Sequence, residues 1–335
     1  MFSQMLKNGL ISKTKDNFKF INMKFMPFLN FISKHYFIFV GLYFLISALR
    51  ASLHPAASTD YKIYLFLLAF AAFTVFFDIR RDVKLISFCV LAVPFLYFIW
   101  YLNIHGYELW GKLLAWENGL KIIVDLNPIF SKIPFNDASF ARIYKTETLT
   151  SFFRIVYNNG FVLPLLIPLY RAFIALDFKK MLRYALSGHI FQVFLITPFY
   201  LTFHLQEVWY VLGQPDGLAR NLSAKAAAGV TLNCFPSMHT SISFAMFLLV
   251  MREKNKIFRY VWGFLCLCVI YSTMYLEIHW VIDVIGGLIL AYATVKLVDF
   301  VLAKGEQLLA GPLNRLYYKK RQTSTFLNNY YTDNK

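Results

Sequence analysis

Charged residues are scarce in this 335-residue sequence, and acidic residues are the scarcest of them. Asp, Glu, Lys and Arg together make up 16% of the chain, whereas 58% is hydrophobic and the mean hydropathy is +0.52. A soluble fold of this length needs far more polar surface. The composition therefore excludes an ordinary soluble domain and indicates a protein of the lipid bilayer.

Cysteine is also scarce, and the four cysteines have neither zinc-site spacing nor the pattern of a disulfide framework. The acidic residues form no cluster suited to magnesium, so we expect no metal and no cofactor. The net charge of +16 comes with Lys and Arg in the connections between apolar runs. It is therefore mainly a topology signal and secondarily an attraction to anionic lipids, and it does not imply nucleic acid.

Long apolar runs predict an all-α fold, a polytopic membrane helical bundle. A helix needs about 20 apolar residues to cross about 30 Å of hydrocarbon. The runs predict about eight transmembrane helices, at 36–52, 60–78, 84–103, 152–176, 182–203, 236–251, 258–276 and 280–302. Lys and Arg are concentrated in alternate connections, which places both termini in the cytoplasm. The 236 and 280 helices then begin at the extracytoplasmic face, periplasmic or lumenal.

Three parts are expected along the chain. Residues 1–35 are a basic amphipathic segment, expected as an interfacial helix, residues 36–303 form the membrane domain, and residues 304–335 are a basic cytoplasmic tail. The connection 104–151 is too long for an ordinary loop and mixes aromatic and aliphatic residues with single charges. We expect its first half to be an amphipathic helix on the outer face, and a re-entrant hairpin is the alternative.

Two histidines next to apolar runs are the candidate reactive groups, because such residues usually mark a functional site. His279 and Asp283 are four residues apart, so a helix would place them on one face. The carboxylate can then hold Nδ1–H and leave Nε2 as a nucleophile. His239 follows Pro236 and Ser237, and Ser237 is the predicted N-cap of a helix whose free N–H groups suit a phosphate.

Both histidines lie in recognisable motifs. Phe235–His239 reads Phe-Pro-Ser-Met-His, and three residues separate His279 from Asp283. These patterns resemble the second and third signature motifs of the type-2 phosphatidic acid phosphatase superfamily, whose members are membrane enzymes that work through a phosphohistidine. The resemblance covers roughly residues 209–300. It implies a six-helix core within the bundle.

Two further stretches resemble one branch of that superfamily, the inositol phosphorylceramide synthases. They are Gly217–Arg220 and Tyr271–Leu276. The chain departs from the phosphatase pattern in two places: Thr273 stands where the phosphatases usually have Arg, and a Lys-x6-Arg-Pro first motif is missing. Because the synthases depart at the same points, both differences favour transfer over hydrolysis.

The resemblance implies a lipid phosphotransferase that moves inositol phosphate from phosphatidylinositol to a ceramide-type hydroxyl and releases diacylglycerol. His279 would be the nucleophile, Asp283 its partner, and His239 the general acid and base. The expected partners are a phospholipid donor, a ceramide-like lipid alcohol and the membrane, and the oligomeric state is left open. The expected substrate contacts are Arg220, Ser237, Tyr275 and Trp280.

Several alternatives stay open at this point. A lipid phosphatase acting on phosphatidate or an isoprenyl diphosphate would use the same histidines, although Thr273 counts against it. A transporter or scaffold would leave the spacing of the histidines unexplained. Arg220 is either a substrate contact or part of a salt bridge that orders its loop. The remaining polar residues within spans are expected to pair inside the bundle; they are Arg154, Arg171, His189 and Gln192.

Overall fold

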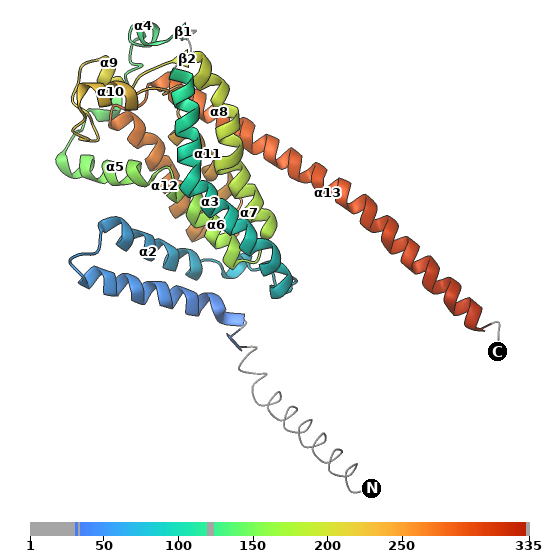
Figure 1. The fold of residues 1–335 in the computed structure, drawn as a ribbon. Helices are drawn as coiled ribbons and strands as arrows, with labels where there is room; N and C mark the ends of the chain where they lie inside the picture. The colour runs from blue at the N-terminus through green and yellow to red at the C-terminus, as the bar shows by residue number, and fades with distance from the viewer. Residues whose placement is uncertain (1–30, 33, 119–123, 333–335) are drawn as a thin grey trace. The chain divides into compact units, whose positions relative to one another are not determined.

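The structure is a computed structural model that describes residues 31–32, 34–118 and 124–332 (Figure 1). The interfacial helix expected in residues 1–35 lies outside the described residues, except at its last positions. Helices dominate the described part, and its one sheet pairs two residues of β1 with two of β2 in parallel. The prediction of an all-α, polytopic helical bundle is confirmed.

The elements follow one another along the chain, beginning with the helix Lys34–Leu53. They continue as α2 (Thr59–Phe73), η1 (Phe76–Asp78), α3 (Leu85–Asn118), β1 (Val124–Asp125), α4 (Asn127–Phe130), η2 (Ser139–Arg142), α5 (Glu147–Asn159), α6 (Leu163–Ile174), α7 (Phe178–Ala185), η3 (Leu186–Ile190), α8 (Phe191–Thr202), β2 (Phe203–His204), α9 (Val208–Val211), α10 (Ala224–Val230), α11 (Met238–Val250), α12 (Lys256–Tyr275) and α13 (Val281–Thr332). Their contacts divide the chain into two units, Met1–Phe77 and Asp78–Lys335.

The first unit contains the helix Lys34–Leu53 and α2. Ser58 caps α2 by accepting a hydrogen bond from the Tyr61 backbone N–H. The two helices approach closely at Gly41, where an added Cβ would lie 2.6 Å from the Phe73 ring. A glycine at this position therefore allows a contact that a larger residue would disrupt.

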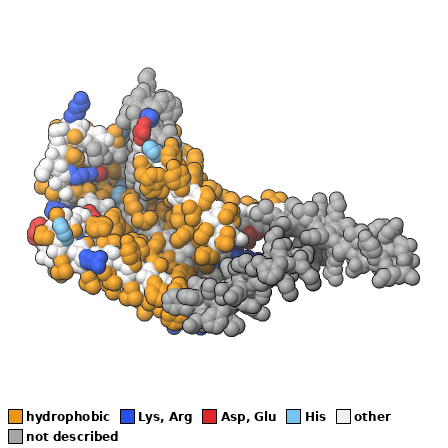
Figure 2. Space-filling model, turned by 60° about the horizontal axis from the view of Figure 1, so that its bottom comes forward, with side chains coloured by type: hydrophobic (Ala, Val, Ile, Leu, Met, Phe, Trp, Pro, Cys, Tyr) orange, Lys and Arg blue, Asp and Glu red, His pale blue; other side chains and the backbone are white. Residues whose placement is uncertain are grey.

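Several helices of the described part are candidates to span a membrane. Five described helices are long and apolar enough to cross a membrane, or six if the bent pair α5 and α6 is one span. α2 has 15 residues and α11 has 13, so both are shorter than these candidates, and the total of about eight spans stays a prediction. Exposed hydrophobic side chains cover much of the described surface in Figure 2. These features indicate an integral membrane protein, and its orientation stays a prediction.

Two long helices cross segment boundaries that were expected from the sequence, and the boundaries themselves stay predictions. α3 runs unbroken through 34 residues to Asn118, so the first half of the 104–151 connection continues the preceding helix instead of forming a separate one. The two glycines of this stretch, Gly106 and Gly111, each cost only about 1 kcal/mol in a helix and do not end it. Similarly, α13 runs through 52 residues to Thr332, so the predicted tail continues the last membrane helix.

The core of the second unit joins the two sequence motifs. α11 packs against both α12 and α13. The approach of α13 is closest at Gly287, where an added Cβ would lie 2.6 Å from the Ser237 carbonyl oxygen. The backbone N–H of Ser237 donates to the Asp283 carbonyl oxygen at 3.1 Å. The small Gly287 thereby lets the start of α11 lie directly on the first turns of α13.

A buried ionic cluster connects η1, α6, α7 and the turn after α11. Arg171 is 2% exposed and donates to Asp78 at 2.6 Å and to Glu253 at 2.7 Å. Lys180 contacts both carboxylates, and the Tyr184 hydroxyl donates to Glu253 at 2.5 Å. The prediction that Arg171 pairs inside the bundle is confirmed. Separating these segments would leave buried charges without a partner, which is costly. The cluster therefore helps to hold the four segments together.

We expect Arg171→Met to lower the free energy of unfolding by about 3–5 kcal/mol, since Asp78 and Glu253 would then share only Lys180. Arg80→Met is the matched control, because Arg80 pairs with Asp82 on the surface, where ion pairs contribute little. Thermal unfolding of both variants in the same detergent gives the comparison. Equal shifts in the two variants would show that the buried cluster does not stabilise the bundle.

Candidate active site

His239 is positioned by the start of α11. The Ser237 hydroxyl accepts a hydrogen bond from the Thr240 backbone N–H at 3.3 Å, which confirms the predicted N-cap. The imidazole stacks on the Tyr157 ring with centroids 4.3 Å apart, and the Phe161 ring meets it at a steep angle at 5.3 Å. These two aromatic contacts restrict the orientation of the His239 ring.

His279 lies in the turn between α12 and α13, so the expectation that it shares a helix face with Asp283 is corrected. α12 ends in a Schellman motif, in which Glu277 N–H donates to the Met274 carbonyl and Ile278 N–H to the Thr273 carbonyl. Glu277 has the left-handed φ of 62° that glycine usually supplies. Arg142 holds its carboxylate at 2.8 Å. The turn that carries His279 is thus fixed by its own hydrogen bonds and by an ion pair.

Asp283 connects this turn to α13. Its Oδ2 accepts hydrogen bonds from the Trp280 backbone N–H at 3.1 Å and from His279 Nδ1 at 3.2 Å. The first contact is the reach-back half of a capping box, in which an acidic residue in the first turn satisfies the N-cap N–H. The second contact directs the opposite nitrogen, Nε2, away from the carboxylate. The predicted contact between His279 and Asp283 is therefore present. His279 lies just before α13, however, and Asp283 lies in the first turn of that helix.

Asn136 completes the cap of α13 and was not found by sequence reasoning. Its side-chain oxygen accepts from the Ile282 backbone N–H at 3.0 Å, and its carbonyl accepts from the Val281 N–H at 2.8 Å. Asn136 lies almost 150 residues before these partners. No local pattern in the sequence could have indicated this contact.

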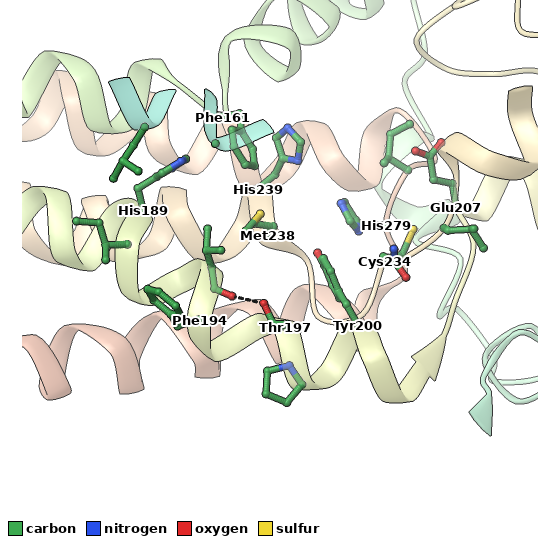
Figure 3. A pocket seen from close by; sticks show the side chains of 18 of the residues that line it. Phe161, His189, Phe194, Thr197, Tyr200, Glu207, Cys234, Met238, His239 and His279 are labelled. Atoms are coloured by element: carbon green, nitrogen blue, oxygen red, sulfur yellow. Dashed lines mark hydrogen bonds between the residues drawn. The ribbon is translucent and has the colours of Figure 1, made fainter. Parts of the chain in front are cut away.

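The two histidines meet at a cavity of about 1040 Å³ (Figure 3). The centroids of the His239 and His279 rings are 6.3 Å apart. Polar and sulfur-containing groups surround this end of the cavity; they are Tyr157, Glu207, Asn233 and Cys234. An apolar arm runs along α8, lined by Ile190, Val193, Phe194 and Pro198. The cavity thus combines a reactive polar end with room for a hydrocarbon chain.

The polar residues predicted within the spans have different surroundings. Gln192 accepts from the Ser241 hydroxyl at 2.5 Å and donates to the Ser187 carbonyl at 3.0 Å. Arg154 donates to the Gly217 carbonyl at 2.8 Å. His189 instead lines the cavity beside Phe161, in the π-helical turn η3. Gln192 therefore pairs within the bundle as predicted, whereas Arg154 contacts the loop between α9 and α10 and His189 lines the cavity.

Arg220 lies behind the cavity and is paired with two carboxylates. Its guanidinium donates to Glu207 at 2.5 Å and to Asp216 at 2.7 Å. Burial raises the pKa of the Asp216 carboxyl, but hydrogen bonds from Arg220 and from nearby backbone N–H groups lower it more, so this pKa lies below its ordinary value. These contacts match the loop-ordering alternative. A direct role for Arg220 with the substrate stays a prediction.

Tyr275 and Trp280, predicted as substrate contacts, lie in the core. The Tyr275 hydroxyl lies 3.1 Å from the Thr150 hydroxyl, and the Trp280 indole N–H donates to the Gln206 carbonyl at 2.9 Å. Thr273 is buried, and its hydroxyl donates to the Ile270 carbonyl at 2.7 Å. None of the three is among the residues that line the cavity. In this structure they support the turn that carries His279.

One comparison with known proteins matches the part of the chain that contains the candidate site. The family model of the PAP2 superfamily matches residues 184–302, a stretch that contains His239, His279 and Asp283. An uncharacterized protein of Methanocaldococcus jannaschii is 24% identical over 231 residues, which cover 62% of this chain and 86% of that protein. No solved structure matches the chain. The PAP2 match points to a phosphatase or a phosphotransferase and does not separate the synthase branch from the others.

Proposed function

We propose that the protein is a membrane lipid phosphotransferase that moves inositol phosphate from phosphatidylinositol to a ceramide-type hydroxyl and releases diacylglycerol. The observation that carries this proposal is the pair of histidine rings, 6.3 Å apart at one end of a cavity between membrane helices. The choice of headgroup and acceptor comes from the resemblance of Gly217–Arg220 and Tyr271–Leu276 to inositol phosphorylceramide synthases.

His279 is the nucleophile in this scheme. Asp283 holds its Nδ1, so Nε2 attacks phosphorus, a nitrogen–phosphorus bond forms, and the bond from phosphorus to the diacylglycerol oxygen breaks. The Asp283 carboxylate stabilises the positive charge that develops on the imidazole, as in other carboxylate–histidine pairs. The phosphorylated headgroup is then held on His279 until an acceptor arrives.

His239 moves the protons. It donates a proton to the departing diacylglycerol oxygen, and in the second half of the reaction it accepts one from the incoming lipid hydroxyl. The oxygen of that hydroxyl then bonds to phosphorus as the bond from phosphorus to His279 Nε2 breaks. The N–H groups of Met238 and His239 open α11 and have no carbonyl four residues earlier within the helix, so they are suited to hold phosphate oxygens. The apolar arm along α8 takes the hydrocarbon part of a lipid.

The transfer proposal predicts that purified protein in detergent passes labelled inositol phosphate from phosphatidylinositol to added ceramide. Diacylglycerol should appear in equal amount, and without ceramide the release of free inositol phosphate should be slow. Inorganic phosphate released from phosphatidate, with no transfer to ceramide, would instead establish the lipid phosphatase. Inactivity toward every lipid would favour a non-catalytic protein.

The proton-transfer role predicts a leaving-group effect. His239→Ala should slow the reaction of phosphatidylinositol by about 10²–10⁴-fold, because the diacylglycerol oxygen leaves unprotonated. A nitrophenyl diester of inositol phosphate has a leaving group that needs no proton, so its reaction should slow much less. His54→Ala, at an exposed position in the first unit, is the control. An equal loss with both donors would contradict general-acid catalysis by His239.

A further inference from the structure

A carboxylate lies at the reactive end of the cavity. Glu207 is 6% exposed and lines the cavity together with His239 and His279 (Figure 3). It is the only acidic residue among the described residues that line this cavity. The chain beside it is joined to the His279 turn, because Trp209 N–H donates to the Glu277 carbonyl at 2.9 Å. The backbone therefore fixes Glu207 next to the proposed nucleophile.

The hydrogen bonds of Glu207 leave room for one more donor. Arg220 Nη1 donates to Oε1 at 3.2 Å and Nη2 to Oε2 at 2.5 Å. The Trp209 indole N–H also donates to Oε2. A carboxylate has about four acceptor positions, and three of them are used here. A ligand hydroxyl can take the remaining position on Oε1.

The charged side chains near Glu207 do not give this end of the cavity a strong positive charge. Arg220 is shared between Glu207 and Asp216, so these three side chains together carry one net negative charge. Lys112 is the only Lys or Arg among the described residues that line the cavity, and it is paired with Glu108 at 2.8 Å. Apart from the proton that His239 carries in the first half of the proposed reaction, the second negative charge of a phosphomonoester therefore meets the Glu207 carboxylate with little cationic compensation.

We infer that Glu207 is a specificity residue that selects phosphodiesters with a hydroxyl-bearing headgroup over phosphomonoesters. A diester carries one negative charge, and so does the headgroup phosphate once it is bound to His279, whereas an ionised monoester carries two. In a buried site the second charge is repelled by the carboxylate, while a headgroup hydroxyl donates to Oε1. The inference rests on the proposed function and names the substrate class of the same site.

The test compares Glu207→Gln with Asp216→Asn. Both variants remove one charged partner of Arg220, but only Glu207 lines the cavity. kcat/KM is measured for transfer from dioctanoyl phosphatidylinositol to ceramide and for hydrolysis of dioctanoyl phosphatidate. We expect the ratio of monoester to diester activity to rise by about tenfold in Glu207→Gln and to stay within about twofold in Asp216→Asn. An unchanged ratio in Glu207→Gln, or equal changes in both variants, would overturn the inference.

A binding measurement on the unaltered protein needs neither turnover nor a folded variant. A phosphomonoester loses its second proton near a pKa of about 6, whereas a diester does not titrate in this range. Competition against a fluorescent lipid at pH 5.5 and pH 8 should show phosphatidate weakening relative to phosphatidylinositol by about tenfold. The other titratable groups lining this end meet both lipids, so the ratio isolates the phosphate charge; they are Tyr157, Cys234, His239 and His279.

The outcomes separate this inference from the proposed function. A constant or rising affinity ratio for phosphatidate would overturn the role of Glu207 even if transfer to ceramide is observed. The expected loss of phosphatidate affinity, with neither lipid turned over, would support charge selection at this end of the cavity and would count against the phosphotransferase.

Discussion

The candidate site depends on one carboxylate oxygen, Asp283 Oδ2, which accepts hydrogen bonds from the Trp280 backbone N–H and from His279 Nδ1. The first bond caps α13 and the second orients the imidazole. Both hydrogen bonds share this one acceptor atom, so the start of α13 sets the orientation of the His279 ring. α13 itself packs against α11. The Asp283 carbonyl also accepts from Ser237 N–H, so this one residue joins the two motifs and the two histidines.

The surroundings of Asp283 hold this geometry from several sides. The Schellman turn ending α12 fixes the backbone before His279, and Asn136 caps the next two N–H groups of α13. Gly287 lets α11 and α13 touch, which sets the separation of the histidine rings. Tyr157 then restricts the His239 ring by stacking. Each contact is modest, but together they preorganise two side chains from different helices, as catalysis by positioned groups requires.

The parts of the site that could be predicted from the sequence are those that depend on local patterns. The Ser237 cap and the His279–Asp283 pair depend on residues within four positions of each other, and the apolar runs depend on composition alone. Glu207, Asn136 and Tyr157 reach the site only through contacts between distant segments, so no short pattern indicated them. Helix lengths were misjudged where the helix continues beyond the apolar run, as in α3 and α13.

Covalent transfer of the phosphorylated headgroup to His279 can be tested by trapping the intermediate. Protein is exposed briefly to a phosphorus-labelled inositol phospholipid without acceptor, quenched in base, and digested. We expect acid-labile label on the peptide that contains His279, and no label in His279→Ala. Label on the peptide that contains His239 would reverse the two roles. The absence of label, together with inversion at phosphorus, would contradict the two-step scheme and indicate direct transfer.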